Sequence, residues 1–298
     1  MPGETESLTL SLQEAADSLG VHYMTAYRYV RTGRLAATKR GAEWRVAVSD
    51  MEALRDRNAR GHSTSAGEQS SGNPTPPRRR IDYHERLETR LLAGDEAGSW
   101  AILEDAMTAG VDPTEIYLDV MAPAMAAIGE GWAAGNVSVA EEHRASVVML
   151  RIIGRLGPRF TRRGRKRGSV VIGAAPGDHH GVPVALAADL LRGEGFNVID
   201  LGADSPAESF IDAAREAERL IAVGINATSG DNETAIASTI VAIKAALDCP
   251  VVLGGNGLSS IEAGLALGAD RVTLSAPDAL AAFSELAAAR SSRASGAG

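Results

Sequence analysis

Between residues 168 and 290, five short apolar runs alternate with five helix-like segments. Each run is almost continuous in Val, Ile, Leu, Ala and Gly, which is typical of strands buried on both faces of a sheet. We expect strands at 170–174, 197–201, 220–225, 251–253 and 271–274, and helices at 182–194, 206–217, 232–246, 258–266 and 277–290. The alternation predicts an α/β fold with a doubly wound, five-stranded parallel sheet.

Polar side chains and glycines follow three of these strands. The first strand leads into GAAPGDHHGVP, which carries Asp178 and His180, while Asn226-Ala227-Thr228-Ser229-Gly230 and Gly254-Gly255 follow the third and fourth. Ligands of open α/β sheets bind at the carboxyl ends of the strands, where these loops meet. A metal-ligating histidine usually has a carboxylate on its other ring nitrogen, and Asp178 supplies one. The sequence therefore predicts a ligand site at this edge.

The three loops resemble the cobalamin-binding domain of methionine synthase and its relatives, whose pattern is Asp-x-His-x-x-Gly, then Ser-x-Leu, then Gly-Gly. The resemblance implies a Rossmann-like sheet in which His180 is the lower axial ligand of cobalt and Asp178 is its proton partner. The nucleotide tail of cobalamin would enter a slot lined by Asn226, Thr228, Gly254 and Gly255.

The loops depart from that pattern at three positions. Pro183 stands where the family has glycine, and Asn226 and Thr228 stand where it has Ser and Leu. Asn226 can still hydrogen-bond the tail as Ser would. His179 falls on a variable position and is expected to face solvent. The alternative is a Rossmann-like sheet that binds a nucleotide or a response-regulator ligand, with His180 incidental.

Residues 81–160 show the spacing of a helical bundle. Apolar residues recur every three or four positions over Ile81–Ala93, Asp95–Ala109, Pro113–Gly131 and Val139–Leu156, so a four-helix bundle is expected. Two features stand out, namely Trp132 beside a turn and Glu141-Glu142-His143 at the start of the last helix. Taken alone, they fit a core tryptophan and acidic residues that suit the helix dipole.

A bundle directly before a cobalamin-binding sheet resembles the cap of light-responsive transcriptional regulators of the CarH and LitR kind. Their cap carries Trp-x9-Glu-His, and Trp132, Glu142 and His143 have that spacing. The resemblance implies adenosylcobalamin as cofactor, with Trp132 packed against the adenosyl group and Glu142 and His143 near its polar atoms. Such regulators can have a second histidine just after the tryptophan. Ala133 occupies that position here, and His143 is a conceivable substitute.

Residues 8–57 read as a small winged helix-turn-helix. Ser11 and Glu14 form a capping box before a helix that ends near Leu19, and a second helix is expected over Tyr23–Arg31. Two short strands, 33–37 and 44–48, would form a wing around a turn at 39–43, and Ser49-Asp50 would cap a last helix at Met51–Arg57.

This block resembles the excisionase-type branch of the MerR-like DNA-binding domains. The resemblance places the second helix in the major groove of double-stranded DNA and the wing on the backbone or minor groove. The implied contacts are Thr25, Arg28, Tyr29 and Arg31 from the helix and Lys39, Arg40 and Arg45 from the wing. The alternative is a helical domain for protein contacts. So few cations bind DNA weakly, so a homo-oligomer, dimer or tetramer, on repeated half-sites is expected.

Charge and composition separate these blocks. Residues 1–80 carry 12 Lys and Arg against 9 Asp and Glu, whereas the remainder carries 18 against 29. Residues 58–80 are rich in Ser, Gly, Pro and Asn, and are expected to form a flexible linker. Residues 161–168, TRRGRKRG, form a shorter basic connector, and domain boundaries are thus expected at 8–57, 81–160 and 168–290, before a tail from residue 291 onward.

No long apolar run or charged-then-apolar leader is present, so the chain is expected to have no membrane contact and to be cytoplasmic. The lone Cys249 is expected to be reduced and structural. The expected function is non-enzymatic: a cobalamin-binding transcriptional regulator, with light changing oligomeric state and DNA binding. The alternatives are a non-photochemical sensor of cofactor level or redox state, a corrinoid protein of a methyltransferase system, and a scaffold without cofactor.

Overall fold

The computed structural model describes residues 9–19, 26, 30, 35–40, 43–60, 82–228 and 230–296. The chain divides into two compact units, residues 1–81 and 82–298. Among the described residues, no helix combines the length and apolar character needed to cross a bilayer.

The first unit contains a three-stranded antiparallel sheet of order β1-β3-β2. Its elements are β1 (Thr9–Ser11), α1 (Leu12–Leu19), β2 (Thr38–Arg40), β3 (Glu43–Ala47) and α3 (Val48–Arg60). A small core holds them together, and Leu12, Leu35, Val46 and Leu54 are almost fully buried in it. The predicted capping box is present, because the Ser11 amide donates to Glu14 Oε2 at 2.7 Å and the Glu14 amide to Ser11 Oγ at 3.2 Å.

The first strand of the wing is formed by other residues than expected. The strand predicted at 33–37 lies instead at 38–40, where Thr38 pairs with Arg45 and Arg40 with Glu43. Leu35 is only 1% exposed because its side chain fills the core, and residues 35–37 lie outside the strand. Strand β1, which was not predicted, covers the other edge of β3. The last helix begins at Val48, so Ser49 and Asp50 lie inside it.

The bundle of the second unit consists of helices joined by short turns. It consists of α4 (Tyr83–Ala93), α5 (Glu96–Thr108), α6 (Pro113–Glu115), a π-helical segment η1 (Ile116–Met121), α7 (Ala122–Ala133), α8 (Val139–Leu156) and the 3-10 turn η2 (Gly157–Phe160). The third predicted helix is thus α6, η1 and α7 in succession. Pro123 explains the wider turn, because it has no amide hydrogen and its ring crowds the carbonyl of Asp119.

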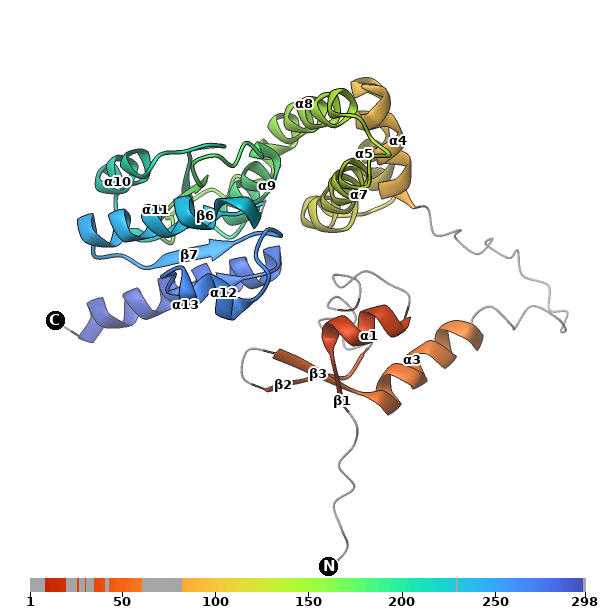
Figure 1. The fold of residues 1–298 in the computed structure, drawn as a ribbon. Helices are drawn as coiled ribbons and strands as arrows, with labels where there is room; N and C mark the ends of the chain where they lie inside the picture. Colours follow the sequence, from red (N-terminus) through yellow and green to blue (C-terminus); the bar gives the residue numbers. More distant parts are fainter. Residues whose placement is uncertain are drawn as a thin grey trace, which may run out of the picture. The chain divides into compact units, whose positions relative to one another are not determined.

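The predicted parallel sheet is confirmed, with strand order β5-β4-β6-β7-β8. The elements are β4 (Ser169–Ala174), α9 (Gly181–Gly193), β5 (Asn197–Asp200), α10 (Ala207–Glu216), β6 (Leu220–Asn226), η3 (Gly230–Asn232), α11 (Glu233–Ala246), β7 (Val251–Gly254), α12 (Ile261–Ala266), β8 (Arg271–Thr273) and α13 (Ala276–Gly296). Helices cover both faces of the sheet (Figure 1). The tail expected after residue 290 is instead helical to Gly296, because its Ala, Ser and Arg residues continue the helix.

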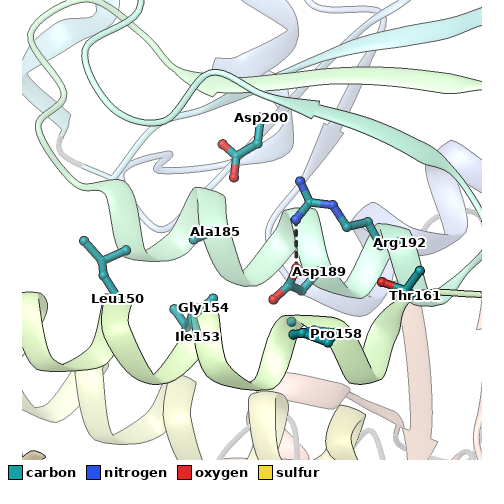
Figure 2. A pocket seen from close by; sticks show the side chains of 10 residues that line it. Leu150, Ile153, Gly154, Pro158, Thr161, Ala185, Asp189, Arg192 and Asp200 are labelled. Carbon is teal, nitrogen blue, oxygen red and sulfur yellow. Dashed lines mark hydrogen bonds and ion pairs between the residues drawn. The ribbon is translucent and has the colours of Figure 1, made fainter.

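The bundle and the sheet domain share one core. Val182, Leu186 and Leu190 of α9 are buried in the same cluster as Met149 and Ile153 of α8. We call this contact between α8 and α9 the seam. A cavity of about 480 Å³ lies alongside it, between the two helices (Figure 2).

A buried polar link crosses the seam. The Tyr117 hydroxyl of η1 donates to Asp189 Oδ2 of α9 at 2.8 Å, and Arg192 donates to Asp189 Oδ1 at 2.8 Å. Tyr117 and Asp189 are 1% and 4% exposed. Apolar packing and a paired buried carboxylate therefore both join the bundle to the sheet.

Candidate functional site

The loop after β4 holds Asp178 beneath His180. The Asp178 carboxylate is buried, and its Oδ1 lies 2.7 Å from His180 Nδ1 and accepts from the His180 amide at 3.1 Å. The carboxylate can only accept, so Nδ1 carries the proton and the lone pair of the ring is left on Nε2. Nε2 has no hydrogen-bond partner among the described residues, and the side chain is 44% exposed. A ring held in this way can donate the Nε2 lone pair to a metal ion.

The loop after β6 closes on the same carboxylate. The Thr228 amide donates to Asp178 Oδ2 at 2.7 Å, and Asn226 Nδ2 donates to Thr228 Oγ1 at 2.7 Å. Three N–H groups therefore surround one buried carboxylate, which fixes its position. Asp178, His180, Asn226 and Thr228 thus form one connected group.

The glycine pair after β7 packs against that loop. The Ala227 amide donates to the Gly254 carbonyl at 2.8 Å, and a Cβ at Gly255 would lie 2.1 Å from the Ala227 carbonyl oxygen. Gly255 also has a φ of +125°, which side chains rarely adopt. At Gly254, a Cβ would lie 2.7 Å from Thr273 Oγ1 of β8. The two glycines therefore let the loop after β7 approach the loop after β6 at backbone distance and leave room for the Thr273 side chain.

Two supporting residues were not predicted from the sequence. Asp204, in the loop after β5, accepts from the Gly177 amide at 2.7 Å and donates its own amide to the Asp178 carbonyl at 2.8 Å. Asn232 has a buried Nδ2 with no partner among the described residues, and it lies near Gly177. Only the topology brings these residues to the loop, since 27 and 55 positions separate them from Gly177.

His179 is exposed beside the loop after β4, whereas Pro183 belongs to the helix that follows this loop. His179 is 78% exposed with Nδ1 3.9 Å from Asp204 Oδ2, as expected of a solvent-facing residue. Pro183 lies in the first turn of α9 rather than in the loop, because that helix begins at Gly181. Its missing amide hydrogen costs nothing there, since the first four amides of a helix have no partner within it.

The bundle presents a second group of candidate residues. Trp132 lies in the last turn of α7 and is 49% exposed, so it is not a core tryptophan. Exposed apolar side chains also lie on α8, including Val139 and Val147. The Trp132 ring is therefore accessible to a ligand or a partner.

The two glutamates at the start of α8, Glu141 and Glu142, have different partners. Glu141 completes a capping box with Ser138, and hydrogen bonds from the Ser138 amide and hydroxyl lower the pKa of its carboxyl. Glu142 accepts from Ser146 Oγ at 2.7 Å and lies 3.6 Å from Nε2 of the largely exposed His143. Glu142 and His143 are therefore adjacent, and no hydrogen bond or ion pair within residues 82–228 and 230–296 joins them to His180.

The predicted DNA contacts lie mostly beyond the structural description. Thr25, Arg28, Tyr29 and Arg31 fall outside the described residues, and only the backbone of Lys39 and Arg40 is described. Arg45 is half-buried on β3, in the middle strand of the wing.

Cys249 is a free cysteine, half-buried before β7. Burial raises the pKa of its thiol, and the nearby carboxylates of Asp270 and Asp248 raise it further.

Three family models match the chain. Residues 83–156 and residues 168–284 each match a B12-binding domain, and residues 9–59 match a helix-turn-helix domain. These spans correspond to the bundle, the sheet domain and most of the first unit. They support a cobalamin-binding protein that carries a DNA-binding domain.

Similar proteins are corrinoid proteins of methanogens. Trimethylamine corrinoid protein 1 of Methanosarcina acetivorans is 30% identical over 125 residues, which is 41% of this chain and 58% of the relative. Trimethylamine corrinoid protein 1 of Methanosarcina mazei is 30% identical over 118 residues, 39% of this chain and 55% of the relative. The chain thus spans little more than half the length of these relatives.

A solved structure shows the same fold. The monomethylamine corrinoid protein of Methanosarcina barkeri superposes with a TM-score of 0.59 at 19% identity, covering 68% of this chain and 98% of that one. At this identity the likeness concerns the fold of the bundle and the sheet.

Proposed function

We propose that this chain is a cobalamin-dependent transcriptional regulator that responds to light through adenosylcobalamin bound between the bundle and the sheet. The observation that carries the proposal is the pairing of His180 Nδ1 with the buried Asp178 carboxylate at 2.7 Å. It leaves Nε2 free at the edge of a sheet whose family model is a B12-binding domain.

The residues at that edge fit a corrinoid. His180 would hold cobalt through Nε2, and Asp178 would hold the proton on Nδ1 and keep the ring oriented. The nucleotide tail would run past Asn226, Thr228, Gly254 and Gly255, where the glycines leave the backbone bare. The unpartnered Nδ2 of Asn232 offers one further donor near the same loop.

The bundle would cover the upper face. Trp132 would pack against the adenosyl group, with Glu142 and His143 near its polar atoms. Adenosylcobalamin would supply a light-sensitive cobalt–carbon bond. Without the adenosyl group, the exposed indole of Trp132 would lose its packing partner, so the bundle would prefer a different arrangement on the sheet.

This preference is what a switch requires. A ligand shifts an equilibrium between two states only if its affinity for them differs. In our proposal the dark form is an oligomer that places several DNA-binding heads on an operator of double-stranded DNA, and the illuminated form dissociates. The contacts would come from Thr25, Arg28, Tyr29 and Arg31 and from Lys39, Arg40 and Arg45 of the wing.

A comparison of dark and illuminated protein tests this function. The full chain is loaded with adenosylcobalamin in darkness, and its absorption spectrum, mass in solution and binding to duplexes selected from a random pool are measured before and after green light. Loading, a dark oligomer and light-dependent release of DNA are expected. His180→Ala should lose the normal coordination spectrum, whereas the neighbouring His179→Ala should keep it.

The other outcomes separate the alternatives. Cofactor binding and DNA binding that do not change with light would contradict light sensing and identify a sensor of cofactor level or redox state.

A corrinoid protein of a methyltransferase system is the second candidate, and the names of the curated relatives favour it. Methyl transfer from the bound corrinoid without any DNA binding would identify it. The helix-turn-helix match at residues 9–59 favours the regulator, because a methyl carrier needs no DNA contact.

A further inference from the structure

The basic connector between bundle and sheet is the most positive part of an acidic unit. Residues 143–177 contain nine Lys and Arg and no Asp or Glu, although residues 81–298 as a whole have 18 against 29. Six of the nine lie within nine positions, from Arg159 to Arg167. Such a concentration of like charge is unfavourable by itself unless an anion accompanies it.

Part of this connector lines a cavity of about 720 Å³, which we call the basic cavity. Five cations line it, and the remaining lining residues are uncharged; the cations are Arg165, Lys166, Arg167, Arg219 and Arg290. The cavity lies where β4 and β6 begin, at Ser169 and Leu220. It is therefore at the opposite edge of the sheet from His180, because the strands are parallel and His180 follows the end of β4.

The connector is held in one conformation at this point. Gly168 has a φ of +150°, and a Cβ there would lie 2.5 Å from the Ile221 side chain. Arg219 has a φ of +53°, an uncommon backbone conformation for a residue other than glycine. Its guanidinium donates to the carbonyls of Lys166 and Arg167 at 3.0 and 3.2 Å. Such strain is retained where the surrounding structure enforces it, which occurs often at functional sites.

The five cations do not all serve the fold. Arg167 stacks on Phe196, donates to Ser284 and pairs with Glu194, and Lys166 Nζ donates to the Arg162 carbonyl. By contrast, the side chains of Arg165 and Arg290 have no hydrogen bond or ion pair with the described residues. Lys166, Arg167 and Arg219 therefore shape the cavity through contacts with the fold. The guanidinium groups of the other two have no such contact among the described residues.

We propose that the basic cavity binds phosphate groups of the DNA backbone, as a second DNA contact besides the helix-turn-helix. This inference rests on the proposed function, because it requires the protein to bind DNA. The cavity is larger than one phosphate needs. Arg159 of η2 and Arg162 and Arg163 of the connector continue the exposed positive surface. An extended positive surface fits a polyanion better than a single small anion.

Removing the two unpaired charges tests the proposal. We expect the double variant Arg165→Gln and Arg290→Gln, in the full chain loaded with adenosylcobalamin in darkness, to bind duplex DNA roughly 10- to 30-fold more weakly at about 0.15 M salt, with a log–log salt slope shallower by about 2. The loss should be equal for a selected duplex and a scrambled one, because phosphate contacts carry no sequence information.

The matched control removes two arginines from the bundle. Arg86→Gln and Arg151→Gln change the net charge equally, and both side chains are exposed, in ion pairs with Asp105 and Glu96. This variant should keep the affinity and salt slope of the unsubstituted protein. Equal losses in the two double variants would overturn the proposal, because general charge would then explain them.

Two further outcomes would also overturn it. If the unsubstituted protein binds DNA and the cavity variant binds it with the same affinity and slope, only this inference fails. Thermal stabilisation by inorganic phosphate that the cavity variant loses, with DNA binding unchanged, would then assign the cavity to a small phosphorylated ligand. If the unsubstituted protein binds no duplex, the proposed function fails first, and this inference with it.

Discussion

Asp178 shows how one buried side chain organises the site. Its carboxylate is 1% exposed and accepts from the amides of His180 and Thr228 and from the His180 ring. Three donors converge on this group, so both of its oxygens are needed as acceptors. This is why an aspartate, and not an amide, belongs at this position.

We expect Asp178→Asn to destabilise the protein without cofactor by about 1 to 3 kcal/mol, because the amide group of Asn would face a donor. Urea unfolding measures this. Asp204→Asn is the matched control, since the exposed Asp204 side chain accepts from one amide and Asn can do the same. Equal losses in the two variants would contradict the assigned role of Asp178.

Tyr117 is the second buried residue whose hydrogen bond contributes to stability, because its hydroxyl donates to Asp189. Burial raises the pKa of its hydroxyl above the ordinary value of 10.0, and the Asp189 carboxylate raises it further. Because the folded state holds the phenolic proton more tightly than the unfolded state, this stabilisation is complete below pH 10.0 and is lost as the pH rises further.

Tyr117→Phe should lower the free energy of unfolding by about 1 to 3 kcal/mol, because Asp189 then loses a donor. It should also remove the loss of stability expected above about pH 10. Urea unfolding at neutral and alkaline pH checks both effects. Tyr83→Phe is the control, since no hydrogen bond from the Tyr83 hydroxyl to the described residues exists; an equal loss there would refute the role of the Tyr117–Asp189 link.

At the scale of elements, the site depends on how closely the loops after β6 and β7 approach. Strand pairing brings Asn226 opposite Gly254, and the loops continue this contact through Ala227 and Gly255. The two loops lie too close together for a Cβ at position 255, so their geometry depends on Gly255.

Gly255→Ala should destabilise the sheet domain by more than Gly110→Ala and weaken cobalamin binding. Both glycines have positive φ, +125° and +91°, but only at Gly255 does a Cβ meet another backbone. Backbone strain alone costs about 1 to 3 kcal/mol, so the difference between the variants isolates the clash. Urea unfolding and cobalamin titration measure it, and indistinguishable variants would show that the loops can separate.

At the scale of the whole molecule, the two units have separate cores. The core of the first unit contains Leu12, Leu35 and Val46, whereas bundle and sheet share the cluster around Met149 and Leu186. Units without a common core unfold separately unless an interface couples them.

Calorimetry of the full chain should therefore show two transitions, of which cobalamin shifts only the one from the second unit. At roughly 100 times the Kd, binding adds about 2.7 kcal/mol of stability. His180→Ala should lose most of the shift and His179→Ala should keep it. A single transition, or a shift of both, would contradict independent units.

Local sequence patterns determined most of the architecture. Continuous apolar runs can be buried only between two helical layers, so the five parallel strands and their flanking helices were predictable, as were the capping box at Ser11 and the helix over Val139–Leu156. The Asp178–His180 pair was predictable for another local reason, because two positions in one loop lie within reach whatever the rest of the chain does.

Tertiary structure decided what distant residues do. The wing strand moved to 38–40 because Leu35 was needed in the core, and Trp132 is exposed although its type suits a core. Thr228, Asp204 and Asn232 join the Asp178 loop, Tyr117 reaches Asp189, and Arg290 reaches the connector. Sequence periodicity reports which face of an element is buried, but not which other element covers it. Only the packed fold brings such residues within a few ångströms of each other.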